Sequence, residues 1–345
     1  MSRSLLLVSL MVACGGQVMA PTSPANEPAV LVGKSIPFPG ATGTAFLDYV
    51  VYEPARQRVW VPVGISGSVD VLDVASSTFT RVDGFKTEER EMQGSKRTLG
   101  PSAASVGDGV VYIGNRATAE VCPVDVKTLE RRSCLKLGSP TDGVSYVASA
   151  KEVWVTTPKE GSLAVLDAST PASLALKTTI KTDGEPEGYA VDDVRGLFFT
   201  NLEDKGSTLV IDVKAHAVKA TWTASCGKDG PRGLAFDSKR NFLVVACTDH
   251  VQVLDAGHDG ALLGRLATGA GVDNVDLVDG TLYVAAGKAA KLTVATLDDA
   301  GSLRVIATAD TAPGVRNAVA DTSGNVYAGD SLGSRLLVFA APSKR

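Results

Sequence analysis

The stretch GEPEGYAVDDVRGLFFTN (Gly184 to Asn201) decides the fold, because its pattern recurs along the chain. It places a turn and one variable residue before a small or apolar run, and a second turn before an alternating apolar strand. Two glutamates bracket its proline, and paired carboxylates on a tight loop can hold a metal or act as acid and base. Taken alone, the stretch leaves open whether it is a catalytic site or the start of a strand.

The same template occurs repeatedly along the sequence. Most copies are followed by a third strand that ends in aspartate, such as LAVLD (Leu163 to Asp167), and then by a fourth apolar segment. Four strands at a period of about 40 to 54 residues are typical of the blades of a β-propeller. The copies begin at Asp48, Ser102, Asp142, Glu187, Arg232, Asp273 and Arg316.

The end of the chain indicates how the ring closes. After Arg316 there is room for only three strands, and the segment PAVLVGKSIPF (Pro28 to Phe38) resembles the fourth strands of other repeats. We therefore expect this segment to be the outer strand of the last blade, which removes an open edge. The sequence predicts an all-β fold: a seven-bladed β-propeller in one domain, residues 28–341, with its last blade closed by the N-terminal strand. The WD40 class is excluded because its Gly-His and Trp-Asp signatures are missing.

The start of the chain predicts export. Residues 1–14 contain a positive charge and an apolar run too short to span a bilayer, and they end in MVAC at Cys14. This ending resembles the lipobox of bacterial lipoproteins, whose cysteine carries the lipid. Residues 15–27 have the composition of a flexible tether. We expect a lipoprotein of the bacterial envelope that faces the periplasm or the cell surface, held to the membrane by its lipid anchor only. Secretion after cleavage at Ala20 is the alternative.

The remaining cysteines support this prediction. Without Cys14 the chain keeps an even number, Cys122, Cys134, Cys226 and Cys247, which suits an oxidising compartment. The first two flank the hairpin of the third and fourth strands of blade two, and the last two lie before blade five and at the end of its second strand. These two pairs are our disulfide candidates, and free buried thiols are the alternative. No CxxC or CxxH spacing occurs, which disfavours zinc.

The repeats resemble the YncE-like, or YVTN-repeat, propellers of bacteria over nearly all of the chain after the signal. The resemblance rests on the Pro-x-Gly turns at Pro186 and Pro231, on strands such as TLYVAA (Thr281 to Ala286) and on the repeated V-x-V-[LI]-D third strands. It implies the architecture. Members of that family act in several ways, so the resemblance assigns no activity.

The register of the repeats predicts a ring of polar residues. In a propeller the first strand of each blade lines the central channel, so residues at one repeat position surround one channel mouth. Between Glu187 and Asp48 the charges alternate in sign through Arg232, Asp273 and Arg316. Because an arginine can fork between two carboxylates, we expect an ion-pair ring that bridges blades. As a hypothetical ligand-binding ring, the set is Asp48, Ser102, Asp142, Glu187, Arg232, Asp273 and Arg316.

Part of the ring lacks a basic neighbour in this register. Asp142 and Ser102 have none, so Asp142 together with Glu187 is the candidate site for a small polar ligand or a divalent cation such as calcium. The PEGYAVD stretch is also similar to loops of metal-dependent gluconolactonases. However, no asparagine occupies the ring register, and two arginines would repel a cation. We expect no catalytic residue, no metal and no cofactor, with a metal-dependent lactonase-like hydrolase at the channel mouth as the alternative.

Composition and motifs narrow the function further. The chain has 34 basic and 38 acidic residues and a net charge of −4, which disfavours nucleic acid as a partner. No GxSxG, HExxH, GxGxxG, P-loop or CxxCH motif is present. The insertion Gly84 to Gly100 is expected to be a charged loop, with a lid or a partner-contact surface as the alternative. The sequence therefore predicts a monomeric binding or protein-interaction scaffold at the envelope, for a protein or a small polar ligand.

Overall fold

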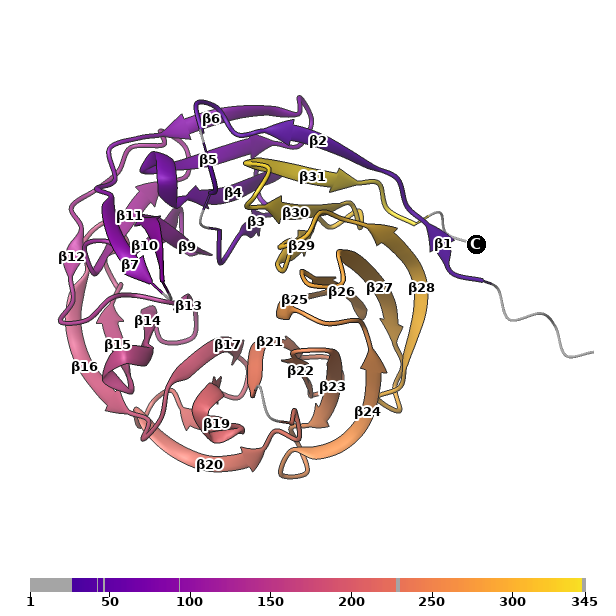
Figure 1. Cartoon of the computed structure of the whole chain (residues 1–345). Helices are drawn as coiled ribbons and strands as arrows, with labels where there is room; N and C mark the ends of the chain where they lie inside the picture. The colour runs from indigo at the N-terminus through magenta and orange to yellow at the C-terminus, as the bar shows by residue number, and fades with distance from the viewer. Residues whose placement is uncertain (1–26, 42, 46, 93, 228–229, 343–345) are drawn as a thin grey trace, which may run out of the picture.

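The strands form blades around a central axis. The computed structural model describes residues 27–342 except 42, 46, 93 and 228–229. Six sheets of four strands and one of five follow one another around the axis (Figure 1), so the predicted seven-bladed β-propeller is confirmed. The predicted signal peptide with its Cys14 and nearly all of the predicted tether lie outside the described residues.

Each blade begins with the strand nearest the axis (Figure 1). In blade order the inner strands are β3 (Val51–Glu53), β9 (Pro101–Val106), β13 (Val144–Val147), β17 (Pro186–Asp192), β21 (Pro231–Asp237), β25 (Val272–Val278) and β29 (Ala318–Ala320). The second strands are β4 (Arg58–Val63), β10 (Val110–Asn115), β14 (Glu152–Thr157), β18 (Leu197–Leu202), β22 (Phe242–Cys247), β26 (Thr281–Ala286) and β30 (Val326–Asp330).

The two remaining strands of each blade lie farther out. The third strands are β5 (Ser68–Asp73), β11 (Glu120–Asp125), β15 (Ser162–Asp167), β19 (Ser207–Asp212), β23 (His250–Asp255), β27 (Lys291–Leu297) and β31 (Arg335–Phe339). The outer strands are β6 (Thr78–Val82), β12 (Leu135–Lys136), β16 (Ala175–Lys181), β20 (Ala217–Thr223), β24 (Ala261–Ala267), β28 (Leu303–Asp310) and β2 (Gly33–Pro37).

Burial follows this order from the axis to the rim. The second and third strands are buried on both faces because neighbouring blades pack against them, which explains their continuous apolar runs. Trp154 of β14, for example, stacks on Phe198 of β18 in the next blade, with ring centroids 4.6 Å apart. The outer strands alternate or are exposed, as in β20.

Aspartates fix the turns that follow the third strands. The carboxylates of Asp73, Asp167, Asp212 and Asp255 each accept a hydrogen bond from a backbone N–H two or three residues further on. Such a bond replaces a backbone turn contact and ends the strand. The repeated V-x-V-[LI]-D motif is therefore a strand followed by its own turn signal.

The N-terminal segment closes the ring, but not as one strand. β2 pairs antiparallel with β31, with Ser35 opposite Leu337, and completes the last blade as predicted. The expected strand from Pro28 to Phe38 is wrong in its extent, because β1 (Ala29–Val30) instead pairs parallel with β28 of blade six. The segment therefore ties blades six and seven together along their outer edges (Figure 1).

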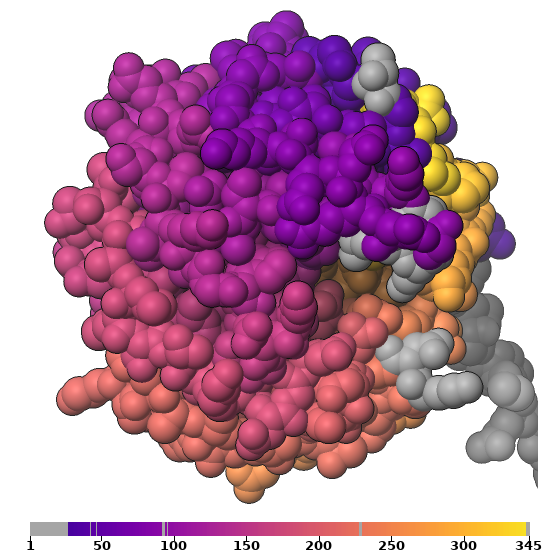
Figure 2. Space-filling model, turned by 60° about the vertical axis from the view of Figure 1, so that its left-hand side comes forward, coloured from indigo at the N-terminus to yellow at the C-terminus, as the bar shows by residue number. Residues whose placement is uncertain are grey.

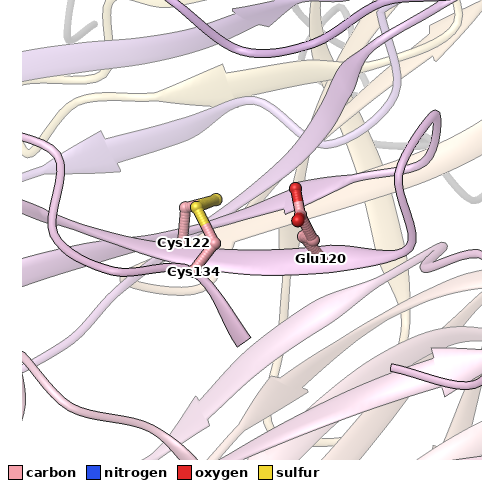
Figure 3. Close-up of side chains that lie close together, drawn as sticks. All are labelled: Glu120, Cys122 and Cys134. Carbon is pink, nitrogen blue, oxygen red and sulfur yellow. A yellow bond between two sulfur atoms is a disulfide. The ribbon is translucent and has the colours of Figure 1, made fainter. Parts of the chain in front are cut away.

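Both predicted disulfides are confirmed. Cys122 of β11 is bonded to Cys134 just before β12 (Figure 3), and Cys226 before β21 is bonded to Cys247 at the end of β22. Glu120 lies on β11 beside the first disulfide. The alternative of free buried thiols is thus ruled out, and two disulfides are typical of an oxidising compartment.

The insertion after blade one is ordered as a hairpin of β7 (Glu88–Met92) and β8 (Ser95–Leu99). The side-chain amide of Asn115 donates to the Lys86 carbonyl at 3.0 Å, and the Arg90 guanidinium donates to the Ala117 carbonyl at 3.1 Å. These contacts attach the hairpin to the turn that follows β10. Within the part of the chain that the structure describes, no helix has the length and apolar character needed to cross a membrane.

Candidate functional site

The predicted ring residues stand at the start of the inner strands or just before them. Hydrogen bonds between neighbouring blades hold their backbones there. The side-chain amide of Asn201 on β18 donates to the Arg232 carbonyl of the next blade, and that of Asn317 donates to the Asp48 carbonyl at 2.5 Å. These asparagines lie outside the ring register, and sequence reasoning gave them no role.

At two further contacts between neighbouring blades, a backbone N–H donates to the carbonyl of a ring residue. The N–H of Tyr49 donates to the Ser102 carbonyl at 2.9 Å, and the N–H of Asn274 donates to the Arg316 carbonyl at 3.3 Å. In each case one blade binds the carbonyl of the ring residue of the next blade. Four of the seven ring residues are therefore held through their backbone carbonyls, independently of their own side chains.

Arg316 behaves as the alternation of charges predicts. Its guanidinium lies 3.4 Å from an oxygen of Asp273 and 3.6 Å from an oxygen of Asp48, so it bridges blades six and one. The Asp273 carboxylate and, to a smaller degree, that of Asp48 raise the pKa of Arg316. Its charge is therefore fixed at every accessible pH.

Arg116 is a cation of the mouth that the repeat register does not include. It stands in the turn between β10 and β11, and its guanidinium lies 2.9 Å from Asp48 and pairs with Asp142. The expectation that Asp142 lacks a basic neighbour is therefore wrong. The repeat register considers only the first strands, whereas this long side chain reaches the mouth from a turn on the same face.

Arg232 does not pair with Glu187. Its guanidinium lies 2.7 Å from Glu203, which stands in a short 3-10 turn (Glu203–Lys205) after β18. The predicted Glu187–Arg232 pair is therefore wrong, because a closer carboxylate from blade four takes the cation. Within the described residues, Glu187 forms no ion pair.

The mouth has more acids than bases. Its carboxylates are Asp48, Asp142, Glu187, Glu203 and Asp273, and its guanidinium groups are Arg116, Arg232 and Arg316.

The excess of negative charge acts on Glu187, whose carboxyl has no ion-pair partner among the described residues. Burial, followed by the negative charges of Asp48, Asp273 and Glu203, raises the pKa of Glu187 to about 8. Burial also raises the pKa of Asp273, although Arg316 opposes that shift. The channel mouth therefore carries a proton at neutral pH, and a cation or a hydrogen-bond donor of a ligand can replace it.

Further polar atoms at the mouth have no partner. One carboxylate oxygen of Asp142 and the hydroxyls of Ser102 and Thr141 are buried without a hydrogen bond to any described residue. Such atoms are rare in folded proteins and gain energy from any donor that reaches them. They lie beside the Arg116 turn, so this side of the mouth is suited to a polar ligand.

A calcium site would need these side chains to rearrange. Within the described residues, the one group of three His, Cys, Asp or Glu side chains with ligand atoms within 4.8 Å of one another is Glu120, Cys122 and Cys134 (Figure 3). There the two sulfurs are bonded to each other. At the mouth Arg116 lies between Asp48 and Asp142, whereas calcium takes six to eight oxygen ligands.

The hairpin borders a cavity of about 610 Å³ next to the mouth. Lys96 and Arg97 of β8 line it together with Arg316, Ile65 and Leu332. The Leu332 side chain is 62% exposed. Figure 2 shows a hollow on this side of the molecule, where purple early blades meet orange later ones. The mouth face thus combines exposed cations, buried acids and exposed apolar surface.

Comparisons with known proteins support the fold. No protein-family model matches the sequence, and no curated protein matches it in sequence. The chain is similar in structure to a chain of the mitotic checkpoint complex, with a TM-score of 0.72, 12% identity, and coverage of 97% of this chain and 99% of that one. For hydrazine synthase of Kuenenia stuttgartiensis the TM-score is 0.71, with 14% identity over 89% and 99% of the chains. Virginiamycin B lyase from Staphylococcus aureus gives 0.69, with 8% identity over 90% and 99%. At such identities the likeness shows the propeller fold alone.

The raised pKa of Glu187 predicts a pH dependence of stability. Its pKa is about 8 in the folded protein, against an ordinary value of 4.5. Between these values the folded protein holds a proton that the unfolded chain releases. The contribution of Glu187 is thus fully present below about pH 4.5 and is lost as the pH rises through about 8. We expect Glu187→Gln to make the fall in unfolding free energy between these pH values shallower than in the wild type, measured by urea denaturation.

Glu185 provides the matched control, because it lies two residues earlier and is exposed. Glu185→Gln should keep the wild-type slope. A wild-type slope in Glu187→Gln would show that another group takes up the proton.

Proposed function

We propose that the protein is an exported, lipid-anchored scaffold of the bacterial cell envelope that binds a protein or a small polar ligand at its channel mouth. The observation that carries this proposal is the uncompensated acid at the mouth. Glu187 has no ion-pair partner among the described residues, and a buried oxygen of Asp142 has no hydrogen bond. Groups of this kind cost folding free energy, and a bound ligand recovers it.

The surroundings favour a macromolecular partner at the same face. The β7–β8 hairpin stands beside the mouth with exposed Lys96 and Arg97, and Leu332 adds apolar surface. Charged rims around an apolar patch are typical of interaction surfaces. The hairpin is thus proposed as a partner-contact element. The resemblance of the repeats to YncE-like propellers bears on the architecture alone, and we propose residues 28–341 as a single propeller domain.

The proposed location rests on sequence and disulfides. The lipobox-like MVAC predicts lipidation at Cys14 after removal of the preceding residues, with residues 15–27 as the tether. Two disulfides fit an oxidising, exported environment. Secretion without a lipid remains the alternative.

The binding face can be tested by photo-crosslinking in the native envelope. A photoreactive residue at Lys96 lies on the mouth face, and one at Val194, which is 83% exposed in the turn after β17, lies on the opposite face. We expect discrete crosslinked products from position 96 and none from position 194, identified by mass spectrometry. Equal patterns from both positions, or no product from position 96, would contradict a protein partner at the mouth.

The hydrolase alternative predicts a different result, which can be measured on the purified protein. It requires a divalent cation such as calcium held by Asp142 and Glu187. Stoichiometric calcium in the purified protein, lost on Glu187→Gln together with lactone hydrolysis, would replace the scaffold by the lactonase-like enzyme.

The lipid anchor has its own test. We expect Cys14→Ser to move the protein from the membrane fraction to the soluble exported fraction, because the acyl chains supply the membrane affinity. Cys134→Ser is a control that removes a cysteine without touching the lipobox and should leave the protein membrane-bound. Continued membrane attachment of Cys14→Ser would show that the anchor is wrong.

A further inference from the structure

A cavity of about 310 Å³ lies inside the channel, below the ring. The inner strands of blades one, six and seven form most of its wall, with Tyr189 of blade four and Leu234 of blade five on the other side. It extends from Asp48 at the mouth to Val278 and Thr322 at the opposite end. This volume suits a small organic ligand.

Apart from Asp48, Asn274, Asp276, Asn317 and Thr322, the side chains that line this cavity are apolar or aromatic. Tyr49 and Tyr189 stack with ring centroids 5.4 Å apart, and valines and alanines of β25 and β29 cover much of the rest. No lysine, arginine or histidine occurs among the described residues that line it. Aromatic faces without competing cations attract a positively charged ligand.

Asp276 supplies the negative charge. Its carboxylate lies on β25, lines the cavity, and accepts hydrogen bonds from the backbone N–H of Ala320 at 2.7 Å and of Leu277 at 3.0 Å. Within the described residues it has no cationic partner, in contrast to Asp48, which is paired with Arg116 and Arg316. A carboxylate has about four acceptor positions, so two remain for a ligand.

We propose that this cavity binds an organic ammonium ion, whose charge is balanced by Asp276 and whose apolar part packs against Tyr49 and Tyr189. The proposal does not depend on the proposed partner at the channel mouth. It assigns the ligand class from the wall of the cavity: one unpaired carboxylate, stacked aromatic rings and apolar side chains.

The arrangement of charges also selects the end at which such a ligand enters. At the mouth, Arg116 and Arg316 already pair with Asp48, so this carboxylate does not draw an ammonium ion into the cavity. At the other end, Val278 and Thr322 also line a cavity of about 660 Å³ between blades six and seven. That cavity contains Asp279 and Glu27 besides Arg304. The ammonium ion therefore enters from the face opposite the ring.

Binding should depend on pH through Asp276. Burial raises the pKa of this carboxyl to about 6, so the counter-ion is lost as the pH falls through that value. The other titratable groups near the cavity are the tyrosines, Asp48, whose charge is paired, and Glu187 and Asp273, whose charges act on Tyr49. Asp279, Glu27 and Arg304 lie in the adjoining cavity at the far end. Burial raises the pKa values of Tyr49, Tyr189 and, to about 12, Tyr283, so these groups stay neutral. Tyr52 also lines the wall.

The test uses 2-phenylethylammonium and its neutral counterpart 2-phenylethanol, titrated into the purified protein by calorimetry. The ammonium should bind the wild type more tightly than the alcohol. Asp276→Asn should weaken ammonium binding by roughly tenfold or more and leave alcohol binding unchanged. In the wild type the affinity for the ammonium should fall as the pH drops through about 6, and this dependence should be missing in the variant.

Asp321→Asn is the matched control. Asp321 is a buried carboxylate that accepts the backbone N–H of Ser323 and Asn325 at 2.8 and 3.0 Å, and it does not line the cavity. The Asp321→Asn variant should bind the ammonium with the affinity of the wild type. If Asp276→Asn fails to fold, Val319→Phe fills the cavity without changing a charge and should abolish ammonium binding.

Three outcomes would overturn the proposal: no ammonium binding to the wild type, equal ammonium binding to Asp276→Asn, or equal affinity for the alcohol. The third outcome would leave an apolar cavity in which Asp276 only links blades six and seven. None of these results affects crosslinking at the mouth, so failure of this proposal is distinguishable from failure of the proposed scaffold.

Discussion

Asp48 is the residue on which the geometry of the channel mouth depends. Its carboxylate binds Arg116 of blade two and Arg316 of blade seven, and its carbonyl accepts the amide of Asn317. Through Arg116 the chain of charges continues to Asp142, and through Arg316 to Asp273. One buried carboxylate thus joins the first blade to both neighbours, at the point where the ring must close. β2 performs the corresponding task at the outer edge by pairing with β31.

The same arrangement produces two environments of different chemistry along one channel. At the mouth most carboxylates are paired with arginines. Glu187, which forms no ion pair among the described residues, has a raised pKa. In the cavity below, Asp276 is ionisable without a cationic partner among the described residues, and the surroundings are apolar. A polar or macromolecular ligand suits the first environment, whereas an ammonium ion suits the second.

The fold could be predicted because the repeat fixes it at several levels at once. Turn, inner strand, second strand and aspartate-terminated third strand recur in one order, and a missing last strand identifies the closing segment. The register also placed Asp48, Asp273 and Arg316 correctly beside one another. It could not find Arg116 or Glu203, because both reach the mouth from turns whose lengths and conformations the repeat does not specify. The split of the N-terminal segment into β1 and β2 was missed for a similar reason: a short chain at an edge can pair with either of two neighbouring blades.

The central claim is that a buried ion-pair network centred on Asp48 couples the blades, and a double-mutant cycle with Arg116→Ala and Asp48→Ala tests it directly. Denaturant unfolding at neutral pH should give a coupling free energy of about 2 kcal/mol, because both side chains are largely buried and water screens their attraction poorly. In the single variants Arg116 keeps Asp142 and Asp48 keeps Arg316, so the cycle isolates the one pair. The exposed pair Arg132 and Asp125, 3.5 Å apart, is the reference and should couple by less than about 1 kcal/mol. A coupling between Arg116 and Asp48 no larger than this reference would contradict the account.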